Sequence, residues 1–403
     1  MIEKHAVREL LGAVTLRQKL IIGALTLGLF FIAFILLVPS YSGKNMLSGC
    51  AELSGWEKHV CLEDKFLDIA KGKGLEVAFE RVFKEFSNGN KDVIEFCHGL
   101  THRLGEKMYQ RDSDDSQLFR YGIHGFCAYG YTHGMVIPAL QQGVPPEKFV
   151  KETCDALKPE GERFQRITCF HGIGHGLIIL RRYNIAEALL DCDRLVKYNY
   201  EKNDCFGGAF MESAFPFHAN LLHNSETHFS PPPPYDRLTY CSKLAERYKE
   251  SCYSFSVPPT LVNLTGPFLE ELTKCATLIT SGEKIYCYKG ISRYVGFAVD
   301  FAPKRALDIC LAGPTEAQEL CITTALRTRI RRTTDLEGDG IFCGLAPKEY
   351  QAACFSKLGE SVVYLHSGEK ESWPKLCKDV AGNFADFCLR EAIKSNEKYY
   401  ETN

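Results

Sequence analysis

The chain has 403 residues and an almost balanced charge, with 48 Lys and Arg residues against 50 Asp and Glu residues. This length is enough for more than one hydrophobic core, or for one elongated array. Proteins that bind nucleic acid normally carry a basic excess, and the overall composition of this chain has none. Nucleic acid is therefore not an expected partner.

An uncharged apolar run at residues 20–38 predicts one transmembrane helix, because about 20 apolar residues cross the roughly 30 Å hydrocarbon core of a bilayer. The basic residues that precede it orient the N-terminus toward the cytoplasm: Lys4, Arg8, Arg17 and Lys19. A cleaved signal peptide is the alternative, with Ser40 and Ser42 near the cleavage point, but its apolar region is usually shorter, roughly 7–15 residues. We expect a single-pass membrane protein whose bulk lies in a periplasm, extracellular space or secretory lumen.

Cysteine usage agrees with export. Of the eighteen cysteines, sixteen form pairs about a dozen residues apart: Cys50/Cys61, Cys154/Cys169, Cys192/Cys205, Cys241/Cys252, Cys275/Cys287, Cys310/Cys321, Cys343/Cys354 and Cys377/Cys388. In an exported chain this regularity indicates disulfides. Zinc-binding thiolates are the alternative, but they favour two-residue spacings that this sequence lacks. Cys97 and Cys127 remain, and they are predicted to bridge neighbouring repeats.

The later cysteine pairs recur about every 34 residues, a period typical of stacked helical hairpins. Within residues 306–330, Gly313 is expected to end one helix in a left-handed conformation, and Pro314 to begin the next. Each cysteine pair then straddles the turn of one hairpin, and each disulfide stabilises it by about 3 kcal/mol. The predicted fold is all-α: a disulfide-stapled helical-hairpin repeat array behind one N-terminal transmembrane helix.

The period and the paired helices resemble tetratricopeptide-like repeats, in particular those of secreted bacterial cysteine-rich repeat proteins. The resemblance extends over about residues 154–388 and concerns the architecture, since the usual Trp, Leu-Gly, Tyr and Pro signature positions are not evident. It implies binding of a ligand or protein partner along a groove. It carries over no functional residue.

These features divide the chain into six segments. They are a cytoplasmic stub at 1–19, the signal anchor at 20–39, a juxtamembrane segment at 40–60, histidine-rich repeats at 61–212, a proline-rich insert at 213–240 and histidine-poor repeats at 241–403. The run Pro231 to Pro234 predicts an extended, stiff surface loop within the insert. After the insert only His366 remains.

A repeated five-residue motif contains the candidate metal ligands. His98-Gly99-Leu100-Thr101-His102 recurs as His171-Gly172-Ile173-Gly174-His175, and Tyr129-Gly130-Tyr131-Thr132-His133 is a half-match between them. Residues four apart on a helix share a face, so each full copy directs two imidazoles the same way. A metal site formed by His98, His102, His133, His171 and His175 is predicted. A structural hydrogen-bond network and a pH-responsive contact are the alternatives.

Glycines recur at equivalent positions beside these histidines, as Gly99, Gly130, Gly172 and Gly208. Because glycine costs about 0.5–1 kcal/mol in a helix, the recurrence indicates close backbone approach between neighbouring helices. Gly290 persists in the histidine-poor half. Packing therefore explains the glycines and leaves the histidines unexplained.

Further ligands are predicted around this set. Met211 aligns with the histidine column, Glu212 follows it, and His124 is a reserve ligand. Imidazole suits zinc, copper and iron, and a thioether would favour copper. Glu106 and Glu212 are candidates for acid/base chemistry, with solvated helix-surface carboxylates as the preferred interpretation. His218, His223 and His228 on the insert are either a lid over the site or exposed loop residues.

The sequence thus predicts a membrane-anchored, extracytoplasmic metal protein that handles metal or uses it in catalysis. Whether it is an enzyme is left open, because no common hydrolase or kinase motif occurs. The alternative is a scaffold that gathers protein partners along the repeats. The arginines at positions 327, 329, 331 and 332 are expected to form a solvated helix face.

Overall fold

The computed structural model describes residues 48–53, 55–88, 90–112, 127, 130–158, 160, 163–214, 237–255, 267–298, 303–333 and 335–400. The chain divides into two compact units, residues 1–58 and 59–403, and the second holds every site described below. Among the described residues, no helix is both long and apolar enough to cross a bilayer. The transmembrane helix expected at residues 20–38 lies outside them and stays a prediction.

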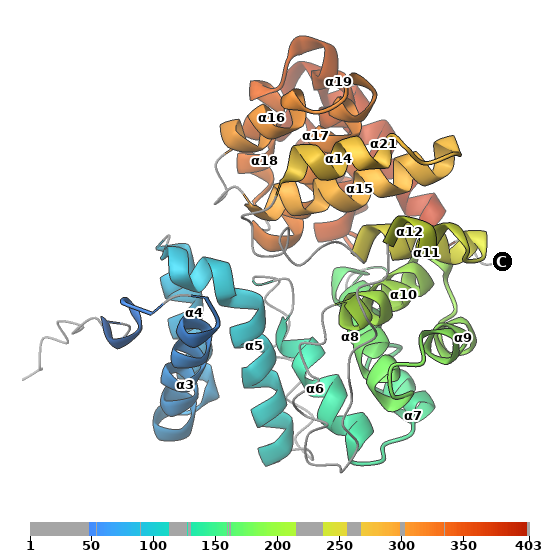
Figure 1. Cartoon of the computed structure of the whole chain (residues 1–403). Helices are drawn as coiled ribbons and strands as arrows, with labels where there is room; N and C mark the ends of the chain where they lie inside the picture. The colour runs from blue at the N-terminus through green and yellow to red at the C-terminus, as the bar shows by residue number, and fades with distance from the viewer. Residues whose placement is uncertain are drawn as a thin grey trace, which may run out of the picture. The chain divides into compact units, whose positions relative to one another are not determined.

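All secondary structure in the described part of the chain is helical (Figure 1). Before the insert, the described elements are the 3-10 helix η1 (Ser48–Cys50) and the helices α3 (Gly55–Lys73), α4 (Leu75–Ser87), α5 (Lys91–Asp112), α6 (Gly130–Gln141), α7 (Pro146–Glu152), α8 (Arg163–Leu180), α9 (Ile185–Leu195) and α10 (Asn199–Ala214).

The histidine-poor part consists of α11 (Arg237–Ser242), α12 (Glu246–Phe255), α14 (Phe268–Cys275), α15 (Ser281–Ala298), α16 (Pro303–Ala312), α17 (Thr315–Thr333), α18 (Leu336–Leu345), α19 (Lys348–Leu365), η5 (Lys370–Ser372), α20 (Trp373–Ala381), η6 (Gly382–Phe384) and α21 (Ala385–Tyr399). The expected all-α array is confirmed for the described residues.

The hairpins combine an outer and an inner helix. The outer α9 is amphipathic and begins at Asn184, whose side chain accepts a hydrogen bond from the Glu187 amide, a standard N-cap. The inner α8 is buried along almost its whole length. A helix buried on all sides is a core element, so residues on α8 have their surroundings fixed by neighbouring helices.

The predicted disulfides are confirmed. Seven hairpin bridges are present: Cys154–Cys169, Cys192–Cys205, Cys241–Cys252, Cys275–Cys287, Cys310–Cys321, Cys343–Cys354 and Cys377–Cys388. Cys97 bonds to Cys127, as expected, and Cys50 and Cys61 are disulfide-bonded as well. No cysteine is free. Such a set belongs to an oxidising, extracytoplasmic compartment.

The inner helices form a row in which each contacts the next, in the order α5, α6, α8, α10, α12, α15, α17, α19 and α21. The row also returns on itself, because α8 contacts α19. Phe164 and Ile167 pack there with Tyr364 and Tyr399 in one buried cluster. Arg166 adds a buried ion pair with Glu201, at 2.7 Å, and the Tyr399 hydroxyl donates to the same carboxylate.

Two local predictions are wrong. Gly313 does not adopt a left-handed conformation, since α16 ends one residue earlier and the Gly313 amide bonds the Cys310 carbonyl at 3.2 Å. Nor do the described arginines of α17 form a solvated face. Arg329 is 4 % exposed and pairs with the fully buried Asp339 at 3.0 Å. Arginine spacing alone did not show that α17 is an inner helix.

Candidate metal centre

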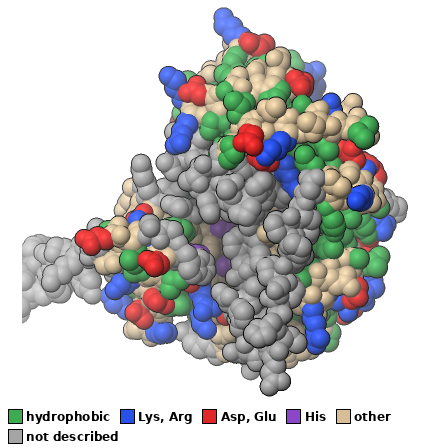
Figure 2. Space-filling view, in the orientation of Figure 1, with side chains coloured by type: hydrophobic (Ala, Val, Ile, Leu, Met, Phe, Trp, Pro, Cys, Tyr) green, Lys and Arg blue, Asp and Glu red, His purple; other side chains and the backbone are tan. Residues whose placement is uncertain are grey.

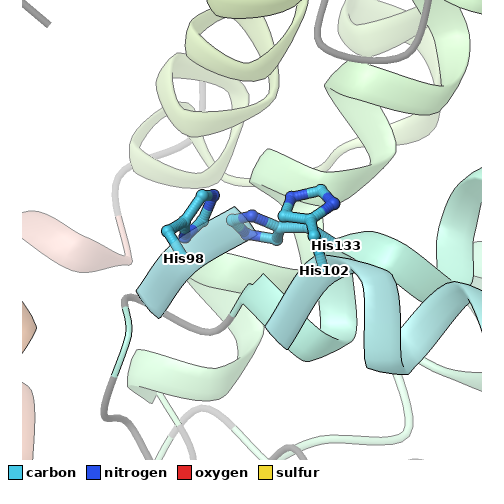
Figure 3. A group of neighbouring side chains, drawn as sticks. All are labelled: His98, His102 and His133. Carbon is cyan, nitrogen blue, oxygen red and sulfur yellow. The ribbon is translucent and has the colours of Figure 1, made fainter. Parts of the chain in front are cut away.

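Five histidines of the repeated phrase converge in the second unit. His98 and His102 come from α5, His133 from α6, and His171 and His175 from α8. Figure 3 shows the first three rings side by side. Ligand atoms of His98, His102 and His133 lie within 4.8 Å of one another, as do those of His133, His171 and His175. His133 thus belongs to two overlapping triads.

Glycines hold these helices close enough for the rings to meet. A Cβ added at Gly134 would lie 1.9 Å from the His102 carbonyl oxygen, and one at Gly208 would lie 1.9 Å from that of His171. No side chain fits at such distances, so only glycine allows α6 to approach α5 and α10 to approach α8. The close approach predicted from the glycine column is confirmed.

One nitrogen of each of four rings is already hydrogen-bonded, and the acceptor comes from the following repeat. The contacts are His98 Nδ1 to the Cys127 carbonyl at 2.8 Å, His133 Nε2 to the Thr168 carbonyl at 3.1 Å, His171 Nδ1 to the Asp204 carbonyl at 3.0 Å, and His175 Nδ1 to a Glu212 carboxylate oxygen at 3.0 Å. Carbonyl oxygens only accept, so Nδ1 of His98, Nε2 of His133 and Nδ1 of His171 carry a hydrogen. In the neutral form of each of these rings, the other nitrogen is an acceptor. This orientation by an outer partner is typical of metal-ligating histidines.

The two histidines of α8 show the consequence most directly. Nε2 of His171 and Nε2 of His175 lie 3.3 Å apart. When both rings are neutral and carry their hydrogen on Nδ1, the two facing nitrogens both present lone pairs, and a cation between them would bind both. Two imidazole nitrogens about 2.0–2.1 Å from one tetrahedral zinc ion lie about 3.3–3.4 Å apart, which matches the observed separation.

His133 has a buried ring nitrogen that could bind the same ion. Its ring is 2 % exposed, and Nδ1 has no hydrogen-bond partner among the described residues. Burial, together with the neighbouring His171, His98 and His175, lowers the pKa of His133 well below its ordinary value. The ring is therefore neutral near pH 7, with an unsatisfied lone pair inside the cluster. A buried polar atom without a partner is costly unless a ligand satisfies it.

Glu212 anchors the cluster from α10. It is fully buried, bonds His175 with one carboxylate oxygen and accepts the Tyr183 hydroxyl with the other, at 3.1 Å. Burial and this carboxylate raise the pKa of Tyr183, which stays a donor. Glu106 is also buried and accepts from Arg103 and from Gln110. The prediction that both glutamates are solvated is thus wrong.

Of the other predicted ligands, the described residues include Met211. Met211 is half-buried, and it is its neighbour Glu212 that contacts a cluster histidine. His124, Tyr129 and the three insert histidines lie outside the described residues, so their roles stay predictions. Sequence reasoning missed Tyr183, which follows α8 without any motif, and Phe255, whose ring lies 5.2 Å from that of His171. Neither residue belongs to the repeated phrase.

The cluster is buried on one side and more accessible on the other. His175 is 1 % exposed, whereas His98 is only partly buried. Histidine atoms are visible near the centre of the face shown in Figure 2. An ion held by His133, His171 and His175 would be enclosed, and one nearer His98 would have a route to solvent.

Comparisons with known proteins give no match. No protein-family model matches the chain, and neither the curated proteins nor the solved structures include a match to it.

Proposed function

We propose that this chain is an extracytoplasmic metal-binding protein whose cluster binds a transition metal ion through His133, His171 and His175. The observation that carries the proposal is the convergence of three buried imidazoles, whose ligand atoms lie within 4.8 Å of one another and include two Nε2 atoms 3.3 Å apart. The orphaned Nδ1 of His133 supplies the third ligand atom. An all-imidazole set suits zinc, copper or iron, and the half-buried Met211 gives no reason to favour copper.

His98 and His102 extend the site toward solvent. With His133 they form the second triad, and an ion there has room for a water molecule or a substrate, as catalytic metal sites require. The enclosed triad fits stable metal retention, and the outer triad fits metal exchange or metal-assisted catalysis. In this proposal residues 20–38 anchor the chain, with the disulfide-linked repeats on the exported side.

The direct test is the metal content of the full chain, purified without chelators and measured by mass spectrometry. We expect a stoichiometric transition metal in the unmodified chain and its loss in the variants His171→Gln and His175→Gln. His366→Gln is the matched control, because His366 lies outside the cluster and bonds only Glu369 with its ring. Folding of each variant is checked by far-UV circular dichroism.

One outcome would contradict the proposal. If the oxidised, folded chain is offered zinc, copper and iron in turn and retains no more of any metal than the His171→Gln/His175→Gln double variant, no site exists. A proton shared between the two rings would then be the cation that separates them. Carbonate extraction of membranes tests the anchor independently, since a transmembrane helix stays in the pellet and a cleaved chain does not.

A further inference from the structure

A polar cavity borders the histidine cluster. Asp204, whose carbonyl contacts His171, and Phe255, whose ring lies 5.2 Å from that of His171, both line it. The cavity has a volume of about 250 Å³ and is lined from seven helices of the row, α8, α10, α12, α15, α17, α19 and α21. Its cationic lining residues are Arg163, Lys289, Arg293, Arg327, Lys357 and Lys398. Only three carboxylates, Asp204, Glu250 and Glu360, face them. None of the five cluster histidines lines this cavity.

The repeat itself brings these charges together. In the hairpins of α8, α15, α17 and α19, the residue six positions after the second cysteine is His175, Arg293, Arg327 and Glu360 in turn. On α8 this position faces the histidine cluster, and on the other three helices it lines the cavity. In these four hairpins the same repeat position faces a polar site, and its residue type changes from histidine to arginine and glutamate.

Two of the three carboxylates are already paired with cations of the cavity. Lys289 bonds Glu250 at 2.7 Å, and Lys357 pairs with Glu360. Burial raises the pKa of Glu250, but Lys289, Arg327 and Lys398 together outweigh it and lower that pKa. Burial also raises the pKa of Glu360, but Lys357 and Arg327 outweigh it and lower that pKa, so both carboxylates are ionised at neutral pH. The two pairs contribute no net charge, so the remaining cations set the potential of the cavity.

Arg163 is the clearest of these remaining cations. It is 3 % exposed and forms no ion pair within the described chain. Its Nη2 donates to the Asn396 amide oxygen at 2.7 Å, and its guanidinium carbon lies 4.1 Å from the centre of the Tyr399 ring. Nε remains buried without a hydrogen-bond acceptor. A buried guanidinium without a carboxylate is unfavourable unless an anion from outside completes it.

We propose that this cavity binds a small molecule carrying an oxyanion group, a phosphate or a carboxylate. Arg163 would bind the oxyanion through its guanidinium group, and Lys398 and Arg293 would add long-range attraction. The volume of about 250 Å³ is close to the lower end of the range for small-molecule sites and suits a small metabolite. The rings of Tyr200, Tyr364 and Tyr399 line the same space and provide apolar walls for the rest of the molecule.

The test is isothermal titration calorimetry of the full chain with inorganic phosphate, glucose 6-phosphate and citrate, each against chloride at equal ionic strength. Binding of the first two alone identifies a phosphate site, and binding of citrate alone identifies a carboxylate site. Arg163→Gln should weaken binding by more than about tenfold, since a hydrogen bond between charged groups is lost. Arg163→Lys keeps the charge without the planar donors, so its affinity should lie between those of the unmodified chain and of Arg163→Gln.

Lys398 provides a variant that does not endanger folding, because its side chain is exposed. Lys398→Gln should weaken binding by about threefold to tenfold. Lys394→Gln, one turn away on α21 and outside the cavity, should change nothing. Two results would overturn the proposal: no heat with any of the three anions, or equal affinity in the unmodified, Arg163→Gln and Lys398→Gln chains.

The experiment also separates this site from the metal centre. An anion that binds a metal ion loses its affinity when the chain is treated with chelator, whereas an anion in the cavity keeps it. We expect unchanged affinity after chelation. Loss of binding on chelation would place the anion at the histidine cluster and reject the cavity, whatever the outcome of the metal analysis.

Discussion

The front half (α5, α6, α8 and α10) and the back half (α11 to α21) are built by the same means and differ in what they enclose. In both, glycine permits one inner helix to approach the next: a Cβ at Gly208 would lie 1.9 Å from the His171 carbonyl oxygen, and one at Gly290 would lie 2.0 Å from that of Tyr253. The front half encloses imidazoles, whereas the back-half helices enclose, together with α8 and α10, a cavity of Lys, Arg and Glu side chains. Disulfides and glycines therefore belong to the scaffold, and the inward residues differ.

Adding one methyl group to a glycine of each half is the strongest test of the division into scaffold and inward residues. Gly208→Ala and Gly290→Ala should both destabilise the fold by about 1–3 kcal/mol or more, because the new Cβ meets a backbone carbonyl oxygen that cannot move alone. Only Gly208→Ala should also abolish metal binding, since it separates α8 from α10. Chemical denaturation and metal analysis measure the two effects.

Gly344→Ala is the control for this pair. Gly344 lies on α18 with nothing within 4 Å of its added Cβ, so alanine there should be neutral or stabilise the chain by up to about 1 kcal/mol. Equal metal loss in Gly208→Ala and Gly290→Ala would show that the cluster responds to global loosening. The division into scaffold and inward residues would then fail.

Removing one disulfide in each half tests the scaffold role. Replacing Cys310 and Cys321 by Ala opens an eleven-residue separation and should cost about 3 kcal/mol of unfolding free energy in the chain-entropy model, without loss of metal. The same change at Cys192 and Cys205 should cost a similar amount and also weaken metal binding, because Cys205 lies on α10 next to Asp204, the acceptor of His171. Metal retained equally by both variants would argue against that link.

Glu212→Gln sharpens the account of the front half. The amide oxygen can still accept from His175, but the buried charge that raises the basicity of this ring is gone. Metal affinity should fall by about 10-fold to 100-fold, as for other outer partners of metal ligands. The affinity is measured by competition with a chromophoric chelator. Full retention of affinity would mean that Glu212 has only a structural role.

Tyr183→Phe is expected to have the smallest effect. It removes one hydrogen bond, at 3.1 Å, from the outer side of the Glu212 carboxylate and leaves the histidines untouched. A loss of metal affinity of up to about tenfold is expected, in the same assay. An effect larger than that of Glu212→Gln would indicate that Tyr183 reaches the metal itself.

Much of the site could be predicted, because its geometry is local. Two histidines four apart on a helix must share a face, and glycine beside them in successive repeats must mark close approach. The burial of Glu106 and Glu212 could not be predicted, since burial of a carboxylate depends on which helix packs over it. Tyr183 was missed for the same reason. It acts through a contact 29 residues away in the sequence, which no local spacing encodes.

The helical hairpins, the disulfide pairs and the histidine set follow from the sequence alone, because helix periodicity, turn residues and cysteine spacing act over short distances along the chain. The contact of α8 with α19, which returns the row on itself, and the hydrogen bond from Arg163 to Asn396 depend on how the hairpins pack. That closure is set by the small rotation between successive hairpins, which accumulates over many repeats. The cavity and its charges exist as a result of it.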